Sequence, residues 1–140
     1  MTEHVVRDRP ETLRLQAVMP TLTVDDLDGS IAFYRDVLGF VVVDEIESEG
    51  NRVGAMVRAG AVDLLLGQDD WGQGRDRNKG VAFRLYCTTI QDLDELAADI
   101  RARGGTLATE PPDQPWGARD FSVVDPDGFK ISISTGVVEE

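Results

Sequence analysis

Residues 24–40 read VDDLDGSIAFYRDVLGF, and this stretch decides the fold. Asp26 or Asp28 can cap the start of a helix, since a short acidic side chain accepts hydrogen bonds from the first free backbone N–H groups. Gly39 can end the helix, because glycine adopts the left-handed conformation of a C-terminal cap without strain. Between these residues, four apolar side chains recur at helical spacing and predict one buried helix face, namely Leu27, Ile31, Tyr34 and Leu38.

Short segments of strand-like sequence surround this helix. Residues 15–24 precede it, and Pro20, which lacks an N–H donor, suits them to the edge of a sheet. Residues 40–47, 53–58 and 61–66 follow it and are separated by turn-forming residues. The first half of the chain is therefore predicted to be a β-α-β-β-β unit.

The same order of elements recurs in the second half of the chain, after the polar loop 68–79. A shift of 66 residues places six residues on identical partners, among them Asp26 on Asp92 and Gly39 on Gly105. The strands of the second unit are expected at residues 81–88, before its helix, and at 106–108, 121–124 and 130–134, after it.

Two motifs resemble the signatures of the vicinal oxygen chelate superfamily, which includes glyoxalase I, extradiol dioxygenases and bleomycin-resistance proteins. The first is residues 24–40, and the second is residues 116–131, WGARDFSVVDPDGFKI. The resemblance covers residues 15–135. It implies an α+β fold in which two β-α-β-β-β modules form curved mixed sheets around a cavity, with the helices on the outer faces. It also implies a homodimer.

The resemblance suggests a simple division of the chain. Residues 1–13 form an N-terminal arm, and residues 14–135 form a single glyoxalase/bleomycin-resistance-like domain. Within that domain, module one spans residues 14–67 and module two spans residues 80–135. A length of 140 residues leaves little room for a separate cofactor domain.

The composition excludes several classes of partner. The chain has 14 Lys and Arg residues against 26 Asp and Glu residues, and its net charge of −12 opposes binding to nucleic acid and to anionic membranes. The first residues lack the basic and apolar segments of a signal peptide, and no apolar run approaches the roughly 18 residues of a membrane span. We therefore expect a cytoplasmic protein with neither nucleic acid nor membrane as a partner.

The expected metal positions carry few metal ligands. Metal-dependent members of the superfamily use four residues, usually His, Gln or Glu, and the resemblance places these positions on Met19, Leu85, the strand 62–66 and Ser132. Asp63 becomes a ligand only if the register of its strand slips by one residue. The single histidine, His4, lies in the arm. We predict no metal at the usual site and no cofactor.

Without a metal, the expected pocket is mainly apolar with a few hydroxyl groups. Period-two alternation places Met19 with Thr21, Phe83 with Leu85 and Lys130 with Ser132. Two loops add a tryptophan each and one arginine, which can stack on a flat ligand or bind a carboxylate. The candidate ligand-binding residues are Met19, Thr21, Trp71, Phe83, Leu85, Trp116, Arg119, Lys130 and Ser132. The alternative is that these residues only fill the sheets and the loop ends.

Two functions and a third possibility remain open. The first is a binding protein for a small organic molecule, for which the acidic surface favours a cationic drug. The second is a lyase, isomerase or dioxygenase of the same superfamily, which uses a displaced metal site or polar groups such as Tyr86, Arg119 and Lys130. The third is an accessory dimer without a ligand. The sequence identifies no catalytic residue and no particular ligand.

Overall fold

The computed structural model describes residues 12–109 and 119–135. In chain order the elements are β1 (Thr21–Val24), α1 (Leu27–Ala32), the π-helix η2 (Phe33–Leu38), β2 (Val41–Ser48), β3 (Asn51–Ala59), β4 (Val62–Gln68), β5 (Arg84–Thr88), α2 (Leu93–Ala102), β6 (Asp120–Val124) and β7 (Lys130–Ser134). This is the predicted β-α-β-β-β order in the first half. In the second half, the strand expected at 106–108 is replaced by a single bridge between Thr109 and Ser122.

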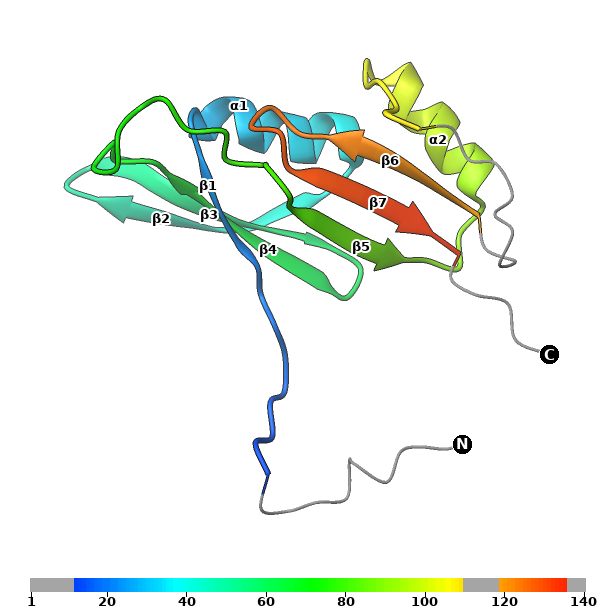
Figure 1. The fold of residues 1–140 in the computed structure, drawn as a ribbon, viewed down its shortest axis with the longest axis horizontal. Helices are drawn as coiled ribbons and strands as arrows, with labels where there is room; N and C mark the ends of the chain where they lie inside the picture. Colours follow the sequence, from blue (N-terminus) through cyan, green and yellow to red (C-terminus); the bar gives the residue numbers. More distant parts are fainter. Residues whose placement is uncertain (1–11, 110–118, 136–140) are drawn as a thin grey trace.

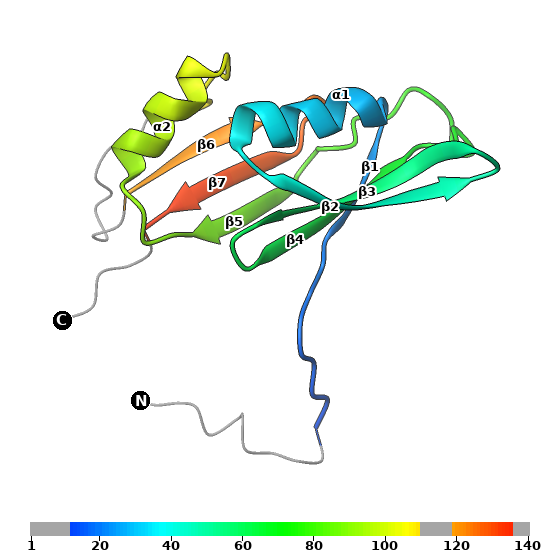
Figure 2. The same cartoon turned by 180° about the vertical axis from the view of Figure 1, so that it is seen from behind.

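The strands form two mixed sheets. The first has the order β1-β4-β3-β2 and the second the order β5-β7-β6. In each sheet, the strand that precedes the helix runs parallel to the last strand of its module, and the other pairs are antiparallel. Figure 1 and the reverse view in Figure 2 place α1 and α2 on the same side of the sheets. The predicted α+β architecture of curved mixed sheets with two helices is confirmed.

The first helix begins at the predicted cap Asp26, and the second begins at Asp92, which the repeat places on Asp26. The side chain of Asp26 accepts a hydrogen bond from the backbone N–H of Gly29, and that of Asp92 accepts one from Glu95. Each helix thereby satisfies one of the N–H groups that have no partner within the helix. The acidic residues at these two points are helix caps.

The spacing from the N-terminal cap to the left-handed glycine differs by one residue between the two helices. Gly39, with φ of 97°, ends the first helix thirteen residues after its cap, whereas the left-handed glycine of the second is Gly104, with φ of 96°, twelve residues after Asp92. The sequence repeat had paired Gly39 with Gly105, so that pairing is wrong by one residue. The first helix accommodates its extra residue by changing from α-helical to π-helical geometry in η2.

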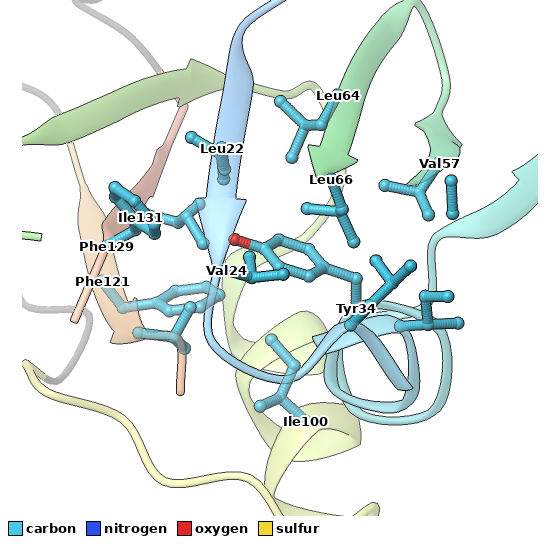
Figure 3. Packing of buried hydrophobic residues seen from close by; sticks show 14 of the residues in the cluster. Leu22, Val24, Tyr34, Val57, Leu64, Leu66, Ile100, Phe121, Phe129 and Ile131 are labelled. Atoms are coloured by element: carbon cyan, nitrogen blue, oxygen red, sulfur yellow. The ribbon is translucent and has the colours of Figure 1, made fainter. Parts of the chain in front are cut away.

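One hydrophobic core serves both modules. Figure 3 shows Tyr34 pointing from the first helix toward side chains of both sheets. The labelled members of this core are Leu22, Val24, Tyr34, Val57, Leu64, Leu66, Ile100, Phe121, Phe129 and Ile131. Each buried side chain of this size favours folding by about 1.5–3 kcal/mol relative to leaving it in water. The two repeats therefore share one buried cluster of side chains.

The first strand is shorter than predicted. Only Thr21–Val24 pair with β4, while residues 12–19 extend away from the sheets in Figure 1. Leu13, Leu15 and Val18 are 82%, 77% and 84% exposed. These residues have strand-like sequence but pair with no strand in the described part of the chain.

The strand predicted at 81–88 also begins later, because its first residues form a turn. The backbone N–H of Phe83 donates to the carbonyl of Gly80 over 3.2 Å. Gly80 packs so closely against Gly128 that a Cβ atom on it would lie 2.0 Å from the Gly128 carbonyl group. The contact holds the beginning of the second module against the turn between β6 and β7.

Candidate functional site

Each sheet has one side that the helices do not cover. In β1, Leu22 and Val24 are buried under the helices, and Thr21 points to the other side, beside Leu65 of β4. Met19 precedes this strand and is 40% exposed. We call this side the open face of the first sheet; it carries Met19, Thr21, Thr23, Met56, Asp63 and Leu65.

Asp63 lies on this open face, contrary to the register expected from the sequence. Leu64 and Leu66 are the residues of β4 that are buried under the helices, which turns Asp63 the other way. Arg58, its partner on β3, donates to it with its Nε atom 2.6 Å from Oδ1. This hydrogen bond lowers the pKa of the Asp63 carboxyl group. The carboxylate is therefore engaged by a guanidinium group within its own sheet.

The corresponding side of the second sheet is polar. The Tyr86 hydroxyl donates to Ser134 Oγ over 2.9 Å, and the Oγ atoms of Ser122 and Ser132 are 2.8 Å apart. We call this side the hydroxyl face; it carries Arg84, Tyr86, Thr88, Asp120, Ser122, Lys130, Ser132 and Ser134, of which the three serines are buried. Lys130 and Ser132 thus share a face, as the alternation in the sequence predicted.

Two cations lie next to each other on the hydroxyl face. Arg84 and Lys130 are register partners on the parallel strands β5 and β7, so their side chains leave the sheet side by side. Neither forms an ion pair with a carboxylate in the part of the chain that the structure describes. Like charges at paired positions are unfavourable unless an anion lies between them.

Phe83 and Leu85 are not on the hydroxyl face. Leu85 packs against the core beside Ile131, and the ring centroid of Phe83 lies 5.0 Å from that of Phe129. The expectation that they share a pocket face with Met19 and Thr21 is therefore wrong.

The prediction for Phe83 and Leu85 failed because the shift of 66 residues between the two halves does not hold in these strands. A shift of 66 residues carries Leu22, which is buried under the helices, onto Thr88, which is exposed. The strand residue that takes the place of Leu22 under the helices is Cys87. A difference of one residue in the shift moves every side chain of a strand to the other face.

Trp71 already has partners within its own loop. The Arg75 guanidinium lies 4.3 Å from its ring centroid, and the Lys79 ammonium lies 5.0 Å from it. The loop is anchored by Asp69, which is 5% exposed and accepts from Lys79 Nζ over 2.9 Å and from Arg77 over 2.6 Å. The hydrogen bond from Lys79 lowers the pKa of Asp69 to about 2. These contacts place Trp71 among cations of the loop rather than on either open face.

Arg119 points toward α2. Its guanidinium nitrogens lie 3.1 and 3.3 Å from the carboxylate oxygens of Asp94, in the first turn of that helix. Trp116, which the sequence placed in the same loop, lies outside the described residues, as does His4. Of the nine candidates, the structure thus brings Met19 and Thr21 together on one face and Lys130 and Ser132 on another.

The residues of the two open sides do not fit a divalent metal ion. The register places three carboxylates on these sides, Asp44 beside Met56, Asp63, which Arg58 engages, and Asp120 beside Ser134, together with hydroxyl groups and two thioethers. Within residues 12–109 and 119–135, no three His, Cys, Asp or Glu residues lie close enough together to hold a metal. Divalent cations need several nitrogen or anionic oxygen donors that converge.

An apolar cavity of about 300 Å³ lies on the helix side of the sheets, where the two modules meet. Its walls come from segments far apart in the sequence, including the end of η2, the turn between β3 and β4, the end of β5 and the helix α2. The free thiol of Cys87 lies in this wall, and burial raises its pKa. The sequence reasoning missed this cavity because it followed single strands. The only signal in the sequence was the apolar stripe of the second helix.

Of the described helices, none is both long and apolar enough to cross a bilayer. Residues 14–133 match the sequence model of the family described as Glyoxalase/Bleomycin resistance protein/Dioxygenase superfamily. A bleomycin resistance protein from Geobacillus stearothermophilus is 33% identical over 128 residues, which cover 84% of this chain and 94% of that protein. A lactoylglutathione lyase from Haemophilus influenzae is 29% identical over 123 residues, with 84% and 90% covered.

Solved structures show the same fold. TnmS3, an antibiotic binding protein from Streptomyces sp. CB03234, superposes with a TM-score of 0.67 at 25% identity, covering 87% of this chain and 97% of that one. TioX from Micromonospora sp. ML1 superposes with a TM-score of 0.68 at 19% identity, covering 84% and 98%. At such identities, TioX is evidence for the fold alone.

Proposed function

Because this chain belongs to the glyoxalase/bleomycin resistance protein/dioxygenase superfamily, we propose that it binds a small organic molecule without a metal at the usual site and without converting it. The observation that carries this proposal is that the carboxylates on the two open sides do not converge among the described residues; they lie among hydroxyl groups, cations and thioethers, where metal-dependent members need converging ligands. The bleomycin resistance protein and the antibiotic binding protein among the relatives support a binding function.

The hydroxyl face provides the polar contacts of the proposed site. Tyr86, which is 52% exposed, can exchange hydrogen bonds with a ligand, and Arg84 and Lys130 provide two adjacent positive charges. Ser132 is 3% exposed and its Oγ atom lies 2.8 Å from that of Ser122, so it supports this surface from within. An anionic group on the ligand relieves the repulsion between these cations. The acidic surface of the whole chain favours cations at long range, whereas this local pair favours an anionic group at the site.

The open face of the first sheet provides the apolar contacts. Met19 and Thr21 stay in the proposed site, and Leu65 and Met56 lie beside them. Trp116, beyond the described residues, is proposed to stack on the ligand. Phe83 and Leu85, which are partly buried and pack against the core, are left out of the proposed site.

A homodimer is part of the proposal, because each open side needs a cover to become a closed pocket. The exposed apolar side chains of Leu13, Leu15 and Val18 support it, since a second copy can bury them. The single free thiol, Cys87, agrees with a cytoplasmic location. Light scattering coupled to size-exclusion chromatography tests the dimer.

Isothermal titration calorimetry tests the binding function. The protein is purified without a His tag and titrated with bleomycin and with a panel of aromatic carboxylic acids. The expected result is binding to at least one compound, weakened about tenfold by Lys130→Gln, since the change removes a charged hydrogen bond. Arg75→Gln, in the loop after β4, is the matched control and leaves binding unchanged.

Metal analysis and an activity assay give the results that would overturn the proposal. Stoichiometric iron, manganese, nickel or zinc in the purified protein, together with turnover of lactoylglutathione, would favour the lyase that one relative is named for. Absence of binding throughout the panel would favour an accessory dimer without a ligand.

A further inference from the structure

The apolar cavity at the module junction is separate from the proposed site. Cys87, Ile131 and Ile133 face the cavity, whereas Tyr86 and Ser132 point to the other side of the same two strands. The first module closes the cavity with Leu38, Phe40 and the turn Ala59–Val62, and α2 closes it with Leu96 and Ile100. A molecule in this cavity therefore contacts both modules without touching Tyr86 or Ser132.

The lining of the cavity has a distinct chemistry. Aliphatic and aromatic side chains form its walls, and Thr88, Thr89 and Gln91 add neutral polar groups. Arg103 is the one charged residue among the lining residues, although the chain as a whole carries a net charge of −12. Small-molecule sites commonly combine an apolar wall with a few placed polar groups in a volume from about 300 Å³ upward.

Arg103 is held in place at this cavity. Its Nε atom donates to the backbone carbonyl of Val37 over 2.8 Å, which fixes the guanidinium group against the end of η2. No carboxylate in the described residues pairs with it. Its remaining N–H donors match the two oxygens of a carboxylate, which a guanidinium group can bind through two parallel hydrogen bonds.

We propose that this cavity is a second binding site, which takes a small amphipathic carboxylic acid such as a medium-chain fatty acid. The acyl chain lies between Leu96, Ile100 and Ile131, and the carboxylate pairs with Arg103. Charge complementarity selects the anion, and the apolar walls select the chain. Because the ligand contacts both modules, its binding also stabilises their packing against each other.

Cys87 provides a direct readout, because it is the single cysteine of the chain and lines the cavity. The full-length protein is treated with the disulfide reagent DTNB, and the rate of thiol modification is measured with increasing decanoate below its micelle concentration. Decanoate is expected to slow the modification in a saturable manner. Decanol, which has the same chain and no charge, is expected to protect at least tenfold more weakly.

Two variants test the residue assignment. Arg103→Gln is expected to weaken protection by decanoate about tenfold and to leave protection by decanol unchanged. Arg101→Gln, an exposed arginine of the same helix that does not line the cavity, is the matched control. Val62→Trp enlarges a side chain at the cavity wall, so it is expected to weaken the binding of both decanoate and decanol. Because Val62 is 39% exposed, the larger side chain is not expected to prevent folding.

Three results would overturn the inference. Decanoate that fails to slow the modification of Cys87 would show that the cavity does not bind it. If decanoate protected Cys87 equally in the wild type and in Arg103→Gln, Arg103 would not be the residue that binds the carboxylate. Loss of protection in Lys130→Gln would place the ligand on the hydroxyl face. We expect decanoate to protect Cys87 in Lys130→Gln as it does in the wild type. Failure of the function proposed above and failure of this second site are therefore distinguishable.

Discussion

Replacing Tyr34 by phenylalanine removes one buried hydrogen bond that joins the two modules. The Tyr34 hydroxyl donates to Asp125 Oδ2 over 2.8 Å, and the two residues are 0% and 4% exposed. Without it, Asp125 keeps only backbone donors, the N–H groups of Asp127 and Phe129 at 2.9 and 2.8 Å. A lost hydrogen bond to a buried charged group costs about 2 kcal/mol, so the free energy of unfolding should fall by about that amount at pH 7.

The cost should depend on pH, because Asp125 titrates. Burial raises the pKa of Asp125 above its unfolded value, and the hydrogen bond from Tyr34 opposes that rise. A carboxyl group with a raised pKa favours folding in its protonated form, and this contribution is lost as the pH rises through the folded pKa. The Tyr34→Phe change raises that pKa further. The destabilisation is therefore largest at neutral pH and becomes smaller as acid protonates Asp125.

Urea denaturation followed by circular dichroism measures the effect at pH 7 and at about pH 5, at one fixed protein concentration. A loss of about 2 kcal/mol corresponds to a fall in Tm of roughly 8 °C for a chain of this size. Tyr86→Phe is the matched control, since Tyr86 is 52% exposed and donates to a neutral serine, so it should cost under about 1 kcal/mol. An equal cost for both variants, or a cost for Tyr34→Phe that is the same at both pH values, would refute this account of the buried carboxylate.

Three other changes have defined outcomes. Gly105→Ala places a methyl group 2.6 Å from two side-chain carbons and should cost about 1–3 kcal/mol in urea denaturation, whereas Gly67→Ala, where no atom lies within 4 Å, should stay within about 0.5 kcal/mol. Asp69→Asn removes the charge that anchors the loop between the modules and should speed its cleavage by trypsin, unlike Asp70→Asn beside it; equal rates would contradict the anchoring role. Asp92→Ala should lower the free energy of unfolding by about 1 kcal/mol in thermal denaturation, and Asp92→Ser should restore most of that loss. If serine restores nothing, the side chain of Asp92 does not act as a cap.

The local signals in the sequence predicted the fold well. Asp26 and Asp92 cap the two helices as expected, and Gly39 ends the first one in the left-handed conformation. The motifs at residues 24–40 and 116–131 indicated a superfamily that the comparisons confirm. Caps, turns and apolar periodicity depend on neighbours within a few residues, so a single sequence contains them.

The site residues were harder to predict from the sequence, because the face of a sheet to which a side chain points depends on the register of its strand. The shift of 66 residues holds at the helix caps but not in the strands, so it assigned Leu85 to the wrong side of its sheet. The partners of Trp71 and Arg119 could not be predicted, since both pair with charged residues that no periodic pattern singles out. Arg103 went unnoticed because its cavity exists only where two modules meet.

The π-helix η2 absorbs a difference of one residue between the two halves of the chain. From the cap to the left-handed glycine, the shift between the halves changes from 66 to 65 residues, so the first helix holds one residue more than the second between these two points. The surplus residue widens the last turns of the helix and leaves both of its ends in place. An alignment of the two halves should therefore open its gap within Phe33–Leu38, and deleting one codon there should return the helix to the regular geometry of its twin.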